Sequence, residues 1–129
     1  MSLQKKKLLV VYEDAVGELE SLAKDIKKSV GASAIVKVRC ATDVSIPEIL
    51  AADAYIFGIG DSNAAVWTEL RRVFEGVNLA GRNALMYCMP GSKPGTKETL
   101  LTWLKPTDIS VSSVACSRGS DAIDWLQSI

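Results

Sequence analysis

The N-terminal part of the chain combines a short apolar run with a longer stretch of helical periodicity. The run Lys7–Tyr12 is almost continuously apolar, which is typical of a strand covered on both faces of its sheet. Apolar side chains then recur at helical spacing from Val16 to Val30, and Gly31 stands where a helix C-terminus favours glycine. A buried strand that passes directly into an amphipathic helix is the repeating unit of a parallel sheet. This feature favours the α/β class.

The alternation of strand patterns with helix patterns continues along the chain. Ser45 and Glu48 have the spacing of a capping box ahead of a short helix. Trp125 lies on the expected closing helix and is interpreted as a packing residue. Helical patterns separate and follow the other expected strands, which are Ala34–Cys40, Ala54–Gly58, Asn83–Cys88 and Ile109–Ala115.

Five strand–helix units in 129 residues predict a single domain that spans residues 1–129. The expected fold class is a doubly wound, five-stranded parallel sheet with helices on both faces. Its strand order is expected to be 2-1-3-4-5, because five short units fit that doubly wound form. Residues 1–4 are expected to be a disordered or cloning-derived start.

The composition argues against several classes of function. The 15 basic and 15 acidic residues cancel, so no general basic field favours nucleic acid or an anionic membrane as a partner. Neither a signal peptide nor an apolar run of about 18 residues is seen, which indicates a cytoplasmic protein. The chain has no histidine, and no nucleophile–base pair or pair of carboxylates is recognisable, so nothing in it indicates catalysis.

The three cysteines are Cys40, Cys88 and Cys116, and they are widely spaced. A zinc or iron–sulfur site requires more soft ligands at closer spacing, so no metal site is expected. We interpret these cysteines as reduced, buried side chains near the ends of strands.

Three loops are expected to converge on one rim of the predicted sheet, because ligands of doubly wound sheets bind beyond the carboxyl ends of the strands. These loops fall at residues 13–18, 59–63 and 89–95. The first loop carries Gly17 just before a helix, where backbone N–H groups attract anions. It also carries acids, among them Asp14, at positions where a phosphate-binding loop would carry hydroxyl groups.

Three segments, taken in order, resemble the flavodoxin family. Residues 11–23 (Val-Tyr-Glu-Asp-Ala-Val-Gly-Glu-Leu-Glu-Ser-Leu-Ala) are similar to its first strand, phosphate loop and helix. Residues 53–58 (Asp-Ala-Tyr-Ile-Phe-Gly) are similar to its Asp-x-x-Ile-x-Gly third strand. Residues 79–85 (Leu-Ala-Gly-Arg-Asn-Ala-Leu) are similar to its Leu-x-Gly-Lys lead into strand four. The resemblance covers nearly the whole chain without an insertion, and it implies a flavodoxin-like fold.

The resemblance also implies a cofactor and a partner. Flavodoxins bind FMN on the convergent rim and transfer single electrons to redox partner proteins. The implied role is therefore an electron carrier rather than an enzyme. The cofactor-binding positions carried over to this chain are Asp14, Ala15, Val16, Gly17, Glu18, Leu19, Ile59, Gly60, Asp61, Ser62, Asn63, Met89, Pro90, Gly91, Ser92 and Lys93.

Several of these positions depart from the flavodoxin pattern. In the phosphate loop only Gly17 matches, and hydroxyl residues of the family are replaced here by Asp14, Val16 and Leu19. Ser62 stands near the position of a stacking side chain, and the third loop has no aromatic residue. A carboxylate about 5 Å from a phosphate repels each unit of its charge by about 3 kcal/mol at an effective dielectric near 20. Weak or absent FMN binding by the isolated chain is therefore expected.

Other functions stay open at this point. A family member that has lost its flavin would serve as a binding or regulatory domain. A phosphoacceptor receiver domain shares the topology, with Glu13 and Asp14 as its acid pair, but it requires an aspartate where Phe57 and Gly58 end the third strand. Trp67 is open between stacking on a ring and packing in the core. The sequence does not indicate an oligomeric state.

Overall fold

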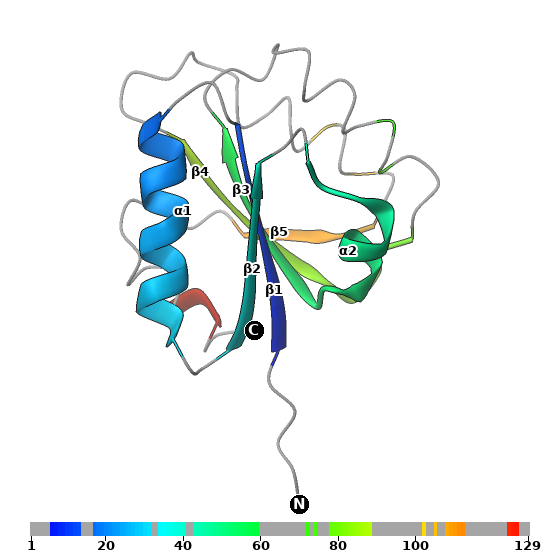
Figure 1. The fold of residues 1–129 in the computed structure, drawn as a ribbon. Coiled ribbons are helices and arrows are strands. Elements are labelled where there is room, and N and C mark those ends of the chain that lie inside the picture. Colours follow the sequence, from blue (N-terminus) through cyan, green and yellow to red (C-terminus); the bar gives the residue numbers. More distant parts are fainter. Residues whose placement is uncertain are drawn as a thin grey trace, which may run out of the picture.

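The computed structural model describes residues 6–13, 17–31, 34–40, 43–59, 72, 74, 78–88, 102, 105, 108–112 and 124–126. Within them, five parallel strands form one sheet in the order β2-β1-β3-β4-β5, with α1 on one face and α2 on the other (Figure 1). The predicted fold class and strand order are confirmed. The elements are β1 (Lys6–Tyr12), α1 (Gly17–Val30), β2 (Ala34–Cys40), α2 (Ile46–Ala51), β3 (Ala54–Ile59), β4 (Asn83–Cys88) and β5 (Ser110–Ser112).

The predicted bounds of β2 and β4 are confirmed, and those of β1 and β3 differ by one residue. β5 is described only at 110–112, and residues 113–115 of the predicted strand lie outside the described residues. Gly31 has a φ of +53° directly after α1, as a glycine that ends a helix does. Gly81 has a φ of +84° in the turn before β4, a second position where a left-handed backbone favours glycine.

The face of the sheet below α1 holds the main hydrophobic cluster. Leu8 and Val10 of β1, Ile56 of β3 and Leu19 of α1 are buried in it. Trp125, in the helical residues 124–126, is 4% exposed and belongs to the same cluster, so its predicted packing role is confirmed. Burying an aliphatic side chain of this size stabilises a fold by roughly 1.5–3 kcal/mol. This cluster therefore fixes α1 over the first three strands.

The opposite face is aromatic. Tyr55 and Phe57 of β3 stack with ring centroids 6.1 Å apart, and Phe74 meets Phe57 edge-on at 5.9 Å. The Tyr55 hydroxyl donates to the Ile49 carbonyl of α2 and accepts from Arg82 Nη1 at 2.9 Å. Burial raises the pKa of Tyr55, and the Arg82 charge opposes that rise in part. The neutral hydroxyl thus joins α2 to β3 and to the turn before β4.

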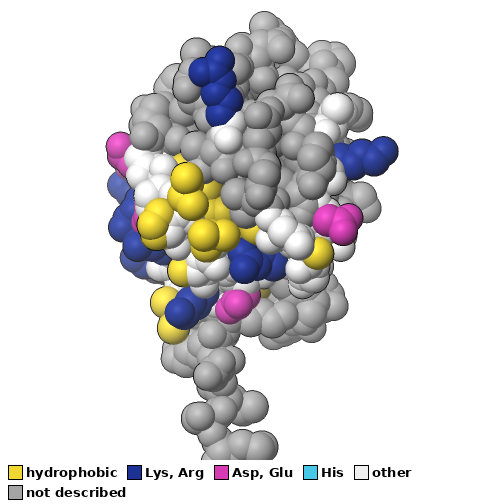
Figure 2. Space-filling model, turned by 90° about the vertical axis from the view of Figure 1, so that its right-hand side faces the viewer, with side chains coloured by type: hydrophobic (Ala, Val, Ile, Leu, Met, Phe, Trp, Pro, Cys, Tyr) yellow, Lys and Arg dark blue, Asp and Glu magenta, His cyan; other side chains and the backbone are white. Residues whose placement is uncertain are grey.

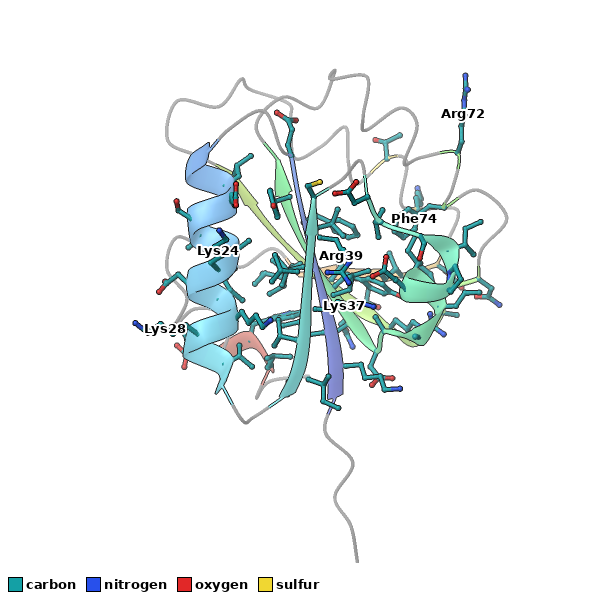
Figure 3. All side chains as sticks on the ribbon, in the orientation of Figure 1. Lys24, Lys28, Lys37, Arg39, Arg72 and Phe74 are labelled. Atoms are coloured by element: carbon teal, nitrogen blue, oxygen red, sulfur yellow. The ribbon has the colours of Figure 1, made fainter. Side chains whose placement is uncertain are left out.

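Glu48 joins α2 to the edge strand β2. Its Oε2 accepts from Arg39 Nε at 2.9 Å and pairs with Lys37 Nζ at 3.0 Å. Figure 3 shows Lys37 and Arg39 extending from β2 toward α2. The Glu48 Oε1 atom accepts hydrogen bonds from the backbone N–H and the hydroxyl of Ser45, both at 3.1 Å, in the predicted capping box. Burial raises the pKa of Glu48. The hydrogen bonds from Lys37 and Ser45 and the charge of Arg39 lower it by more than burial raises it, so the pKa lies below its usual value.

Glu48 makes stability depend on pH in the acid range. Because its pKa is lower in the folded than in the unfolded chain, its contribution is present above about pH 4.3 and is lost as pH falls through the folded pKa. We expect Glu48→Gln to lower the free energy of unfolding near pH 7 by about 1 kcal/mol and to weaken the acid dependence. Urea unfolding between about pH 3 and 7 measures both effects.

Glu20→Gln is the matched control, since Glu20 pairs with Lys24 at 2.9 Å on the exposed face of α1. This variant should retain the acid dependence of the natural chain. An acid dependence of Glu48→Gln equal to that of the natural chain would contradict the role assigned to Glu48.

Candidate functional site

The carboxyl ends of β1, β3 and β4 lie level at one edge of the sheet. In the parallel register Tyr12 is opposite Gly58, and Gly58 is opposite Tyr87. β1 lies between β2 and β3, so the crossover from β1 to β2 through α1 and the crossover from β2 to β3 through α2 run over opposite faces of the sheet (Figure 1). In doubly wound sheets such a switch point opens the crevice in which ligands bind. This edge, which we call the rim, is the candidate site.

Only part of the predicted cofactor site falls within the described residues. Gly17 begins α1, Leu19 lies in its first turn beside Glu18, and Ile59 ends β3. The chain thus brings the start of α1 and the ends of β1 and β3 to the rim. The other predicted positions lie outside the described residues: Asp14, Ala15, Val16, Gly60, Asp61, Ser62, Asn63, Met89, Pro90, Gly91, Ser92 and Lys93, together with Trp67.

The N-terminus of α1 gives the rim a partial positive charge. α1 begins at Gly17, four residues after Glu13, and runs to Val30. The first N–H groups of a helix have no intrahelical partner, and the helix dipole adds about half a positive charge there. Lys27 and Lys28 lie in the last turn, where the dipole favours cations. The scaffold of an anion site is therefore in place.

Glu13 places a buried carboxyl group in this scaffold. The residue is 3% exposed, and its backbone N–H donates to the Gly58 carbonyl at 3.0 Å, which extends the pairing of β1 with β3 by one residue. A buried carboxylate is screened far less by solvent than an exposed one. Sequence reasoning named Glu13 as an acid of the loop but did not reveal its burial. The structure shows that an acid lies inside the rim itself.

Leu19 lies in the core below the rim. Its side chain is fully buried in the cluster with Leu8 and Val10, at a position where the resemblance implies a hydroxyl residue. Helical spacing predicted this inward orientation, because Leu19 falls on the apolar stripe of α1. The Leu19 side chain is thus part of the hydrophobic core.

The cysteines lie near strand ends, as predicted, where the structure describes them: Cys40 ends β2 and Cys88 ends β4. The expected burial of Cys40 is wrong. Its side chain is partly exposed on the edge strand, and its thiol donates to Asp43 Oδ2 at 2.9 Å. Cys116 lies outside the described residues. Among the residues that the structure describes, no three potential ligands gather into a metal site.

Phe57 occupies the position at which a receiver domain would need its aspartate. The side chain is fully buried and packs against Tyr55 and Phe74. The end of β3 is therefore part of the aromatic core.

Over the described ranges, no helix has the length and apolar character needed to cross a bilayer.

Leu19→Thr tests whether this position serves the core or the rim. We expect the threonine to lower the free energy of unfolding by about 2–4 kcal/mol, because it removes buried aliphatic volume and adds a hydroxyl to the core. Chemical denaturation measures the loss. Leu22→Thr on the same helix, where Leu22 is half-buried, is the control and should cost less. Equal losses in the two variants would contradict the placement of Leu19.

Comparisons with known proteins agree with this geometry. No protein-family model matches the chain, and no curated protein matches its sequence. Solved structures do. A short-chain flavodoxin associated with a PDU bacterial microcompartment superposes with a TM-score of 0.76 at 12% identity, covering 95% of this chain and 98% of that one. Oxidised flavodoxin 2 from Bacillus cereus gives a TM-score of 0.76 at 19% identity, covering 95% and 99%.

Fusobacterium nucleatum flavodoxin bound to flavin mononucleotide gives a TM-score of 0.66 at 14% identity, covering 83% of this chain and 69% of that one. At these identities the likeness concerns the fold. The order of the five strands and the position of the rim are those of the same topology. The chain is a flavodoxin-like protein in its fold.

Proposed function

We propose that this chain is a flavodoxin-like electron-transfer module whose rim binds FMN weakly or not at all in the isolated protein. The fold and the helix start at Gly17 support the module. The buried carboxyl group of Glu13 supports the weak binding, and it is the observation that carries the proposal. Asp14 and Glu18 add two further acids to the same segment of sequence.

Electrostatics sets the size of the effect. An FMN phosphate carries about −1.5 to −2 charge near neutral pH. One carboxylate about 5 Å away repels each unit of that charge by about 3 kcal/mol at an effective dielectric near 20. Each missing hydrogen bond to the charged phosphate removes roughly another 1.5–3 kcal/mol. Backbone N–H groups at the start of α1 offset only part of these losses.

The residues present therefore do not fit a phosphate dianion, and we assign them no step in electron transfer. Any redox partner would also meet a chain whose 15 basic and 15 acidic residues cancel. Association with such a partner is expected to depend on shape more than on long-range steering.

A flavin-free binding or regulatory domain is the second candidate. The same buried Glu13 favours it, because a rim that rejects the phosphate leaves the scaffold free for another ligand. The two candidates differ in one measurable property, which is the affinity for a flavin without a phosphate.

Titration of the flavin-free protein with FMN and with riboflavin tests the proposal. If the phosphate contributes unfavourably, riboflavin binds at least as tightly as FMN. Glu13→Gln keeps the shape of the side chain and removes its charge, and we expect it to raise FMN affinity about tenfold or more while changing riboflavin affinity little. Quenching of flavin fluorescence measures both dissociation constants.

Glu20→Gln is the control, because Glu20 lies on the exposed face of α1 in a pair with Lys24. This variant should leave both affinities unchanged. FMN binding much tighter than riboflavin binding in the natural chain would overturn the weak-binding proposal. Failure of both flavins to bind, in the natural chain and in Glu13→Gln, would favour the flavin-free domain.

A further inference from the structure

The exposed apolar side chains of the described residues gather on one side of the molecule. The large hydrophobic residues that are exposed there are Ile35 of β2, at 55%, and Ile46 and Leu50 of α2, each at 49%. Figure 2 views the side on which α2 lies and shows hydrophobic side chains gathered there, with basic and acidic side chains around them. The neighbouring Pro47 and Ala51 are also exposed. We call these five residues the α2 patch.

A hollow of about 250 Å³ lies beside the patch, between α2 and the first halves of β1 and β2. Leu9, which is 1% exposed, lies at its buried side, and Ile35 and Ala51 line its open side. Lys7, Lys37 and Glu48 complete the charged part of its lining. The hollow has the size of an anchor site for one side chain or a small ligand, and it lies below the usual pocket range of roughly 300–1,000 Å³.

The length of α2 explains the hollow. The helix has six residues. The ion pair of Glu48 with Lys37 of β2 and the hydrogen bond from Tyr55 to the Ile49 carbonyl fix its position. Ile49 and Ala52 turn toward the sheet and are buried, whereas Ile46 and Leu50 face solvent. So short a helix leaves part of the sheet beside it uncovered. Contiguous exposed apolar surface of this kind marks interaction sites in folded proteins.

The charges around the hollow favour an anionic occupant. Lys7, Lys37 and Arg39 face two acids, Glu48 and Asp53, which leaves a positive surplus. Glu48 already pairs with two of these cations, and Asp53 Oδ2 accepts the backbone N–H of Lys7 at 2.9 Å. Among the described residues, no ion pair involves the Lys7 ammonium group. A second copy of the chain would place the same cations opposite one another in a symmetric contact, which disfavours self-association.

We propose that the α2 patch docks a segment of a partner protein in which an aliphatic or aromatic side chain fills the hollow and carboxylates meet Lys7 and Lys37. Aliphatic contact with Leu50 and Ile35 supplies affinity, and the lysines select acidic segments. The hollow lies toward the amino ends of β1 and β2, whereas the rim lies at the carboxyl ends. A partner held at this patch leaves the rim accessible, and the proposal holds whether or not a flavin binds.

Three synthetic amphipathic peptides test the proposal. They share one pattern of leucines, and their remaining side chains are glutamate, glutamine or lysine. Titration of the full chain, followed by amide NMR shifts, gives the binding surface and the dissociation constants. We expect saturable shifts at Leu9, Ile35 and Ala51 with the glutamate peptide, affinity at least about threefold lower for the glutamine peptide, and the weakest binding for the lysine peptide.

Two exposed substitutions separate the contributions. Lys7→Glu should weaken binding of the glutamate peptide about threefold or more, and Lys28→Glu on α1 is the matched control that should not. Leu50→Gln should weaken it about tenfold. Because Lys7, Lys28 and Leu50 are exposed, all three variants should retain the unfolding midpoint of the natural chain.

Equal binding of the acidic and basic peptides, or shifts confined to other surfaces, would overturn the proposal. Shifts at the patch that grow with protein concentration in the absence of peptide would assign it to a contact between copies of this chain instead. Saturation of the same residues by sodium octanoate, with no response to any peptide, would make the hollow a small-molecule site and would also overturn the docking proposal.

Discussion

The double burial of β1 is the constraint on which the rest of the structure depends. Leu8 and Val10 face the cluster below α1, while Leu9 and Val11 face the opposite side, and all four are at most 1% exposed. β1 is also paired on both edges, with β2 and with β3, as expected of a central strand in a sheet covered on both faces. That central position creates the switch point, and the switch point places the rim at the end of β1. Glu13 is buried because it continues this strand.

The same constraint separates two surfaces of different chemistry. At the carboxyl ends of the strands, the start of α1 lies near the buried acid Glu13, and in the function proposed here these two groups act on a phosphate in opposite senses. At the amino ends of β1 and β2, the short helix α2 leaves apolar surface and lysines exposed. The proposed docking surface at α2 is therefore separate from the rim at which FMN binding is proposed to be weak.

Local patterns predicted most of the fold. The bounds of β2 and β4 followed from their apolar runs and flanking turns, the capping box at Ser45 from its spacing to Glu48, and the strand order from the number of strand–helix units. These features depend on residues that are close in sequence or on simple topological rules. Trp125 was interpreted as a packing residue because it lies on the expected closing helix, and the structure places it in the main cluster.

The features that were missed depend on contacts distant in sequence. Burial of Glu13 accompanies its pairing with Gly58, and the position of α2 depends on the hydrogen bond from Tyr55 to Ile49 and on the ion pairs of Glu48 with β2. Cys40 was expected to be buried, but β2 is the edge strand, and strand order rather than composition decides that exposure. Most of the candidate cofactor positions lie outside the described residues, so the cofactor site stays a prediction from the family resemblance.

The visible absorption spectrum of the protein, purified without added cofactor, tests the central claim most directly. If the buried carboxyl group of Glu13 at the end of β1 repels the phosphate as proposed, the protein should retain far less than one flavin per chain, and the band of bound flavin should be absent or weak. A yellow protein that carries one FMN per chain through purification would contradict the account.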